Sequence, residues 1–344
     1  MTTTIAIGNC PSSGSTLFSD LLDSSPYTAS GPELNLFALE SLYHNDGKTD
    51  LIDTHSKCSS VYLRRNSLVE NDLCAYGLDI TRLRKILTSS DNLSDILSDF
   101  AENFLSLRGK NIKGVVFEKS PQNIHCIKEY LESTSGYFVH IVRNPINVYK
   151  SLLKRGFLPG IALITWLVDE AKIFNYLDDD RLIVVRYEDL LLNPYKITSE
   201  IIKKITGFSV DEKDIEYNYM NNEYRKHHTV KLSSWTNKEF GKVGKDNKKV
   251  MNDSDVSALV SLRDIKVSKE YAEYFGLAEV SFVQLLETFD YLSDYNDLPL
   301  GNESDFHLSL SEKNHLFRKF ISDIRAGDST LKDIHVYMNP VEKI

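Results

Sequence analysis

The sequence has few cysteines and no long apolar segment, and each shortage excludes a class of protein. Its four cysteines, Cys10, Cys58, Cys74 and Cys126, lack the spacing of a metal site, so we expect no metal and a reducing compartment. No apolar run approaches the roughly 20 residues that span a bilayer. The N-terminus lacks the basic region of a signal peptide. These features predict a cytoplasmic protein without a membrane span.

Positive charge is also in short supply. The 344 residues include 40 Lys and Arg against 49 Asp and Glu, which gives a net charge of −9. This balance argues against a general nucleic-acid binder, and any anionic ligand has to meet a local basic patch. The apolar and charged fractions, 42% and 26%, are those of a globular protein.

Four short apolar runs predict the central strands of a parallel sheet. They are almost continuously apolar, as expected for strands covered on both faces, and a helical pattern follows each of them. The runs are Ile5–Gly8, Gly114–Phe117, Tyr137–Val142 and Leu182–Arg186. The helices are expected over Leu17–Leu22, Gln122–Leu131, Pro145–Arg155, Gly160–Leu177 and Pro194–Thr206. Alternating strands and helices predict an α/β fold that binds ligands at the carboxyl ends of its strands.

Two further regions contain no recognisable functional motif. A long insertion over about residues 40–113 has helical pieces around Ser94–Leu107, and a helical pattern near the C-terminus starts with a capping box at Ser309–Glu312. We therefore expect an α/β domain over residues 1–277, with this helical insertion, and a helical C-terminal appendage over residues 278–344.

The first predicted strand leads into a loop of small residues that opens a helix. Backbone N–H groups at a helix N-terminus favour a phosphate-like group, and hydroxyl groups add further donors. No Walker A lysine follows the first glycine, so the loop predicts a site for an anionic nucleotide without the usual ATP or GTP chemistry. The loop residues are Pro11, Ser12, Ser13, Gly14, Ser15, Thr16 and Leu17.

The third predicted strand ends in an arginine, Arg143. A strand-end arginine can hold a phosphate through two parallel hydrogen bonds. Ser151 and Arg155 follow on the next predicted helix, four residues apart, so both can face the same ligand. The plain alternative is an exposed arginine together with a serine that faces the core.

Lys119 and Glu33 are the other candidates for chemistry. Lys119 ends the second predicted strand and can place a cation on a leaving group, or it can be a solvated lysine before a helix. Glu33 stands in a Gly-Pro turn beyond the loop and can be a general base. It can equally be a glutamate that a helix start favours through its dipole. The fourth strand ends in Arg186–Leu190, which can also be a simple polar cap.

Together these segments resemble the family of sulfotransferases that use 3′-phosphoadenosine 5′-phosphosulfate (PAPS), in the style of its carbohydrate and tyrosylprotein branches. Residues 11–17 look like the family's phosphosulfate loop, and Arg143, Ser151 and Arg155 match its 3′-phosphate motif. Arg186–Leu190 with the later Pro194, and Glu118–Pro121, match two further elements. The resemblance covers residues 3–208 and extends more weakly to about residue 277.

The resemblance implies a P-loop-like central parallel sheet and sulfuryl transfer from PAPS to a hydroxyl or amine, leaving adenosine 3′,5′-bisphosphate (PAP). The acceptor, a glycan, lipid, small molecule or peptide, is not identified by any motif, and neither is the oligomeric state. The resemblance implies Glu33 as the base, with Lys119 and Ser12 as the other catalytic positions, and no metal. Beyond the loop and the 3′-phosphate motif, it implies donor contacts from Tyr187, Trp235, Lys242 and Lys245.

One position departs from the family pattern. The residue after the loop proline is usually Lys or Arg, and here it is Ser12. Two function classes follow: an active enzyme in which Lys119 supplies the missing charge, or a non-catalytic protein that binds PAPS or PAP. A nucleotide kinase is disfavoured, because the Walker A lysine and metal-binding signals are missing.

Overall fold

A computed structural model of the chain describes residues 3–44, 59–62, 70–221, 253–296, 306–325, 327 and 329–344. Among these residues, no helix combines the length and the apolar character that a membrane crossing requires.

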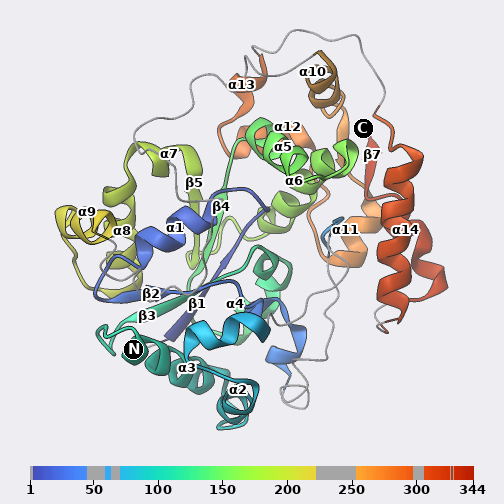
Figure 1. Cartoon of the computed structure of the whole chain (residues 1–344). Coiled ribbons are helices and arrows are strands. Elements are labelled where there is room, and N and C mark those ends of the chain that lie inside the picture. The colour runs from blue at the N-terminus through green and yellow to red at the C-terminus, as the bar shows by residue number, and fades with distance from the viewer. Residues whose placement is uncertain are drawn as a thin grey trace.

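A five-stranded parallel sheet forms the centre of the fold (Figure 1). Its strand order is β2-β3-β1-β4-β5, and all four pairings are parallel. The strands are β1 (Thr3–Gly8), β2 (Thr28–Ser30), β3 (Val115–Lys119), β4 (Phe138–Val142) and β5 (Leu182–Arg186). The predicted α/β fold and its four strands are confirmed. The edge strand β2 was not predicted, because its three small residues form no apolar run.

Helices cover both faces of the sheet, as the near-continuous apolar strands require. Side chains alternate along β1, so that Ile5 and Ile7 join the core beneath one set of helices while Ala6 joins the core beneath the other. The first set is α1 (Ser15–Leu22), α7 (Tyr187–Leu192), α8 (Pro194–Thr206) and α9 (Glu212–Met220). The second set includes α2 (Ile80–Leu87), α3 (Leu93–Leu107) and α4 (Ile127–Ser133).

The described part of the predicted insertion, over about residues 40–113, is mainly helical. Besides α2 and α3 it contains the 3₁₀ helices η2 (Glu40–Tyr43) and η4 (Glu70–Tyr76), and a further 3₁₀ helix, η1 (Leu36–Ala38), lies just before it. After β3, the helix predicted over Gln122–Leu131 instead starts as a 3₁₀ helix, η5 (Pro121–Cys126), and continues as α4. The amide of Asn123 in η5 donates to the carbonyl oxygens of Ile7 and Glu118, which ties this first turn to the sheet.

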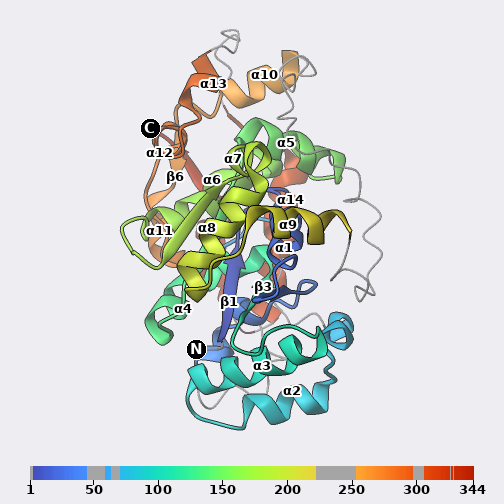
Figure 2. The same ribbon diagram turned by 90° about the vertical axis from the view of Figure 1, so that its left-hand side faces the viewer.

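The remaining helices pack around α6 (Pro159–Phe174). Figure 2 shows α10 and α13 at one end of the molecule and α2 and α3 at the other. The helices that share this apolar core are α5 (Pro145–Lys154), α10 (Asp253–Val260), α11 (Lys269–Phe275), α12 (Phe282–Thr288), α13 (Leu292–Asn296), α14 (Leu310–Arg325) and α15 (Ile334–Met338). A short 3₁₀ helix, η8 (Leu331–Asp333), precedes α15.

The region after residue 277 is mainly helical but ends in a strand. β7 (Val341–Lys343) pairs antiparallel with β6 (Ile265–Val267). The predicted capping box is present, since Glu312 accepts from the backbone N–H of Ser309 at 2.7 Å and donates its own N–H to the Ser309 hydroxyl at 3.3 Å. Helices from both sides of residue 277 share one core. The domain boundary proposed there stays a prediction.

Candidate active site

The loop between β1 and α1 lies where the chain leaves the centre of the sheet. β1 pairs with β3 on one side and β4 on the other, so the loop stands at the switch point where ligands bind in such folds. Ser12 and Gly14 both have left-handed backbones, with φ of 71° and 96°. The carbonyl of Gly14 accepts the N–H groups of Leu17 and Phe18 and starts the helix. Loops with this geometry direct successive N–H groups into an anion-binding hollow.

Tyr187 explains why residue 14 is glycine. A Cβ atom at Gly14 would lie 2.2 Å from the Tyr187 ring. The same ring lies under Arg143, whose guanidinium carbon is 4.7 Å from the ring centroid. Tyr187 therefore packs against both the loop and the strand-end arginine.

Glu188 fixes the end of β4, and the sequence analysis missed this role. Its carboxylate accepts the backbone N–H of Asn144 at 3.2 Å and the hydroxyl of Tyr291 at 2.6 Å. Burial and this carboxylate raise the pKa of Tyr291. The indole of Trp166 donates to the carbonyl of Arg143 at 2.9 Å. The carbonyl of Arg143 and the N–H that follows it are thus held by side chains from α6 and α7. Tyr291, from the segment before α13, in turn holds the α7 carboxylate.

Two arginines reach the loop at Ser12. Arg143 donates through Nη1 to the Ser12 carbonyl at 2.8 Å, and Arg155 donates through Nη1 to the Ser12 hydroxyl at 3.1 Å. Ser151 lies one helical turn before Arg155 and is half-buried. The buried Ser13 Oγ and Arg143 Nε have no hydrogen-bond partner in the described part of the chain. A ligand rich in acceptor oxygens would satisfy both donors, so the residues present fit an anionic nucleotide.

Glu33 and Lys119 form an ion pair beside the start of α1. Lys119 Nζ lies 2.5 Å from Glu33 Oε1 and 3.4 Å from Thr16 Oγ1. The lysine side chain is only 5% exposed, whereas the Glu33 side chain is 43% exposed. The pair therefore combines a buried cation with a carboxylate that remains accessible from the surface.

Glu118 holds the backbone that carries Glu33. This buried carboxylate accepts from the N–H of Leu34 at 2.9 Å, the hydroxyl of Ser120 at 2.6 Å and the amide of Asn123 at 2.9 Å. Burial raises its pKa, while those hydrogen bonds act in the opposite direction. The sequence did contain a signal for this role. Glu118 is an acidic residue at the end of an apolar strand, and a buried carboxylate needs hydrogen-bond donors around it.

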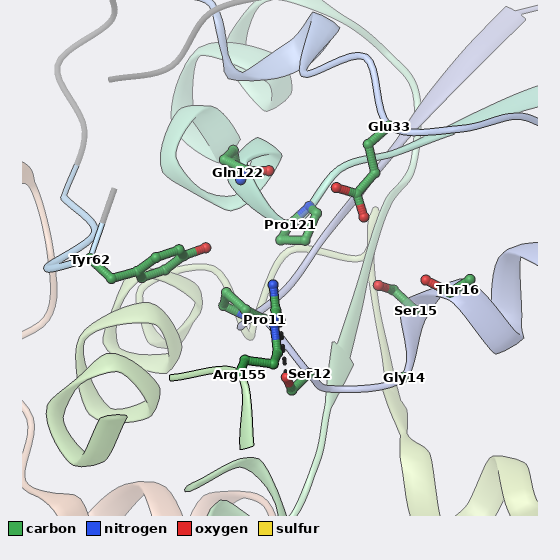
Figure 3. Close-up of a pocket in the computed structure, with 10 residues that line it drawn as sticks. All are labelled: Pro11, Ser12, Gly14, Ser15, Thr16, Glu33, Tyr62, Pro121, Gln122 and Arg155. Atoms are coloured by element: carbon green, nitrogen blue, oxygen red, sulfur yellow. Dashed lines mark hydrogen bonds between the residues drawn. The ribbon is translucent and has the colours of Figure 1, made fainter. Parts of the chain in front are cut away.

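A pocket of about 190 Å³ joins these groups. In Figure 3, Glu33 and Arg155 extend toward it from opposite sides, with the loop along its base. Tyr62 and Gln122 also line it, and no sequence pattern marked either of them. The lining residues are Pro11, Ser12, Gly14, Ser15, Thr16, Glu33, Tyr62, Pro121, Gln122 and Arg155.

A buried acid lies beneath the loop, on α6. Burial and the neighbouring Glu170 raise the pKa of Asp169 well above its usual value. Burial, Asp169 and Glu170 likewise raise the pKa of the Cys10 thiol.

Within the described ranges, no group of three or more His, Cys, Asp or Glu side chains is arranged to hold a metal ion.

The structure thus brings most of the predicted site residues to one edge of the sheet. Three predicted donor contacts, Trp235, Lys242 and Lys245, lie outside the described residues.

Comparisons with known proteins identify the family of this chain. A family model described as "Sulfotransferase family" matches residues 4–209, while a search of curated proteins finds no match. Similar solved structures include the sulfotransferase domain of the Synechococcus PCC 7002 olefin synthase, with 20% identity, 87% of this chain and 96% of that chain covered, and a TM-score of 0.46. The sulfotransferase domain from the curacin biosynthetic pathway has 16% identity, coverage of 92% and 96%, and a TM-score of 0.44. Sulfotransferase STF9 from Mycobacterium avium has 13% identity, coverage of 87% and 78%, and a TM-score of 0.37. Because the family model extends from β1 through α8 and spans more than half of the chain, this protein belongs to the sulfotransferase family.

Proposed function

We propose that this protein transfers a sulfuryl group from PAPS to a hydroxyl or amine of an acceptor. The observation that supports this best is the pocket in which the anion loop meets a reachable carboxylate, Glu33, and a guanidinium, Arg155. An anion cradle, a base and a cation are the groups that the reaction requires, and they surround one space.

The loop would hold the phosphosulfate end of PAPS. Its N–H groups and the hydroxyls of Ser13, Ser15 and Thr16 are donors at a helix N-terminus, where a negative charge is stabilised. Arg143 and Ser151 would hold the 3′-phosphate. The unpartnered Ser13 Oγ and Arg143 Nε support this assignment, because the donor would supply the oxygens that they lack.

Glu33 would take the proton from the acceptor. The acceptor oxygen or nitrogen then forms a bond to sulfur, and the bond between sulfur and the bridging oxygen breaks. The electron pair of that bond leaves with PAP. Lys119 holds Glu33 in place and puts a positive charge beside Thr16, where it offsets negative charge on the phosphosulfate.

A second candidate is a non-catalytic protein that binds PAPS or PAP on the same fold. The neutral Ser12 favours it, because the family's loop usually has a cation at that position. The two candidates share the donor site and differ only in turnover.

Thermal unfolding with PAP and with ATP–Mg²⁺ tests the donor site that both candidates share. PAP at about 100 times its dissociation constant should add about 2.7 kcal/mol of stability. ATP–Mg²⁺ at the same concentration should add much less. Equal stabilisation by the two nucleotides would contradict the assignment of the 3′-phosphate site.

A further inference from the structure

The family motif assigns Arg155 to the 3′-phosphate, but its side chain lies elsewhere. We propose that Arg155 binds the phosphosulfate group and supplies the cation that the loop lacks at Ser12. This inference rests on the proposed transfer from PAPS and adds a residue to its catalytic machinery.

The positions of the two arginines support the distinction. Arg155 lines the pocket together with the loop and Glu33, and Figure 3 shows its guanidinium extending into that space above Ser12. Its hydrogen bond goes to the Ser12 hydroxyl, the side-chain position from which a lysine would extend in other family members. Arg143 instead lies over Tyr187 and donates to the Ser12 carbonyl. Arg155 therefore extends into the pocket, whereas Arg143 stacks on Tyr187 and contacts the loop backbone.

Local backbone geometry explains how Arg155 reaches the pocket. It is the C-cap of α5, and Gly156 follows with a left-handed φ of 85° that turns the chain away. A cation is favoured at a helix C-terminus, where backbone carbonyls carry partial negative charge. Arg155 is also exposed, so its guanidinium can exchange the Ser12 hydroxyl for a donor oxygen. The small Ser12 side chain leaves room for this approach.

Arg155 would act as the bond between sulfur and the bridging oxygen breaks. The electron pair of that bond stays on the bridging oxygen, which becomes part of the PAP phosphate, while the acceptor proton goes to Glu33. A guanidinium within hydrogen-bond distance of that oxygen offsets the charge as it develops. Ser12 and Arg155 together would then replace the single loop cation of the family.

Binding measurements separate this role from a 3′-phosphate contact. Calorimetry would compare PAPS with adenosine 5′-phosphosulfate, which lacks the 3′-phosphate, in Arg155→Ala, Arg143→Ala and the neighbouring control Lys154→Ala. Arg155→Ala should weaken both ligands by a similar factor, roughly 10- to 100-fold for a lost charge-assisted hydrogen bond. Arg143→Ala should weaken PAPS alone. Lys154→Ala, which removes an exposed charge one residue away, should change neither affinity.

Turnover gives a second readout: the signal is PAP released from PAPS, with the sulfuryl group passed to pooled glycans, lipids, phenols and peptides supplied as acceptors. Arg155→Ala should lower kcat by roughly 10²- to 10³-fold, as for the loss of a preorganised donor. Adding Ser12→Lys to Arg155→Ala should restore part of that loss, and Arg155→Lys should lose less than Arg155→Ala. If Arg155→Ala weakens PAPS but leaves adenosine 5′-phosphosulfate unaffected, the inference is overturned and Arg155 binds the 3′-phosphate. If the unmutated protein binds neither PAP nor PAPS, the proposed function itself fails.

Discussion

Replacement of Gly14 by alanine tests how the anion loop is built. Two costs are expected to add at this residue. The left-handed φ of 96° costs an alanine about 1–2 kcal/mol. The new Cβ would also lie 2.2 Å from the Tyr187 ring, and displacing a packed side chain typically costs about 1–3 kcal/mol. The free energy of unfolding should therefore fall by about 2–5 kcal/mol for Gly14→Ala.

Gly207→Ala is the matched control for this experiment. Gly207 ends α8 with a similar left-handed φ of 76°, but outside its immediate chain neighbourhood nothing lies within 4 Å of its ideal Cβ position. For Gly207→Ala, the free energy of unfolding should fall only by the cost of the left-handed backbone, about 1–2 kcal/mol. The difference between the two variants therefore measures the contact between the loop and Tyr187.

Urea unfolding monitored by tryptophan fluorescence gives both values, provided that the slope of free energy against urea is unchanged. Gly14→Ala should also bind PAP more weakly than Gly207→Ala does, because the loop or the Tyr187 ring has to move. Equal losses of stability in the two variants, together with unchanged PAP binding, would refute the idea that Tyr187 braces the loop.

Three further changes test the site. Glu33→Gln keeps the shape of the side chain but cannot accept a proton, so turnover should fall roughly 10²- to 10⁴-fold while calorimetry shows normal PAP binding. Near-normal turnover would assign the base elsewhere. Lys119→Ala should reduce kcat by at least about 10²-fold with a smaller change in PAPS affinity, and a fully active variant would remove Lys119 from the mechanism. Asp169 has a raised pKa in the folded protein, so its contribution to stability is present below its ordinary pKa and is lost as pH rises. Asp169→Asn should therefore gain stability relative to the unmutated protein as pH rises from 5 to 8, by at most about 1.4 kcal/mol per pH unit in urea unfolding. A stability difference that does not change with pH would contradict the raised pKa of Asp169.

The sheet was predictable because its main strands are buried on both faces. A strand such as β4 then needs a continuous apolar run, which is visible in the sequence. β2 escaped prediction because Thr28–Ser30 is short and its side chains are small. The loop and the strand-end positions of Arg143 and Lys119 were also predictable, since parallel strands bring their carboxyl ends to one edge of the sheet.

The contacts that each side chain makes were harder to predict than the strand or helix on which the residue lies. The spacing of Ser151 and Arg155 places both on one helix face, but the pocket position of Arg155 also depends on the turn at Gly156. Glu118 and Glu188 hold the site through hydrogen bonds to backbone groups far away in the sequence. Tyr62 comes from a segment without any periodic pattern. Such contacts depend on how elements pack together, which local sequence does not encode.

Transfer from radiolabelled PAPS tests the central claim most directly. The unmutated protein would be incubated with labelled PAPS and pools of glycans, lipids, phenols and peptides, with Glu33→Gln as a control that should still bind the donor. The proposed function predicts that label moves to at least one pool, that PAP forms in equal amount, and that Glu33→Gln lowers both. Tight binding of PAP without transfer to any pool would contradict it and favour the non-catalytic alternative.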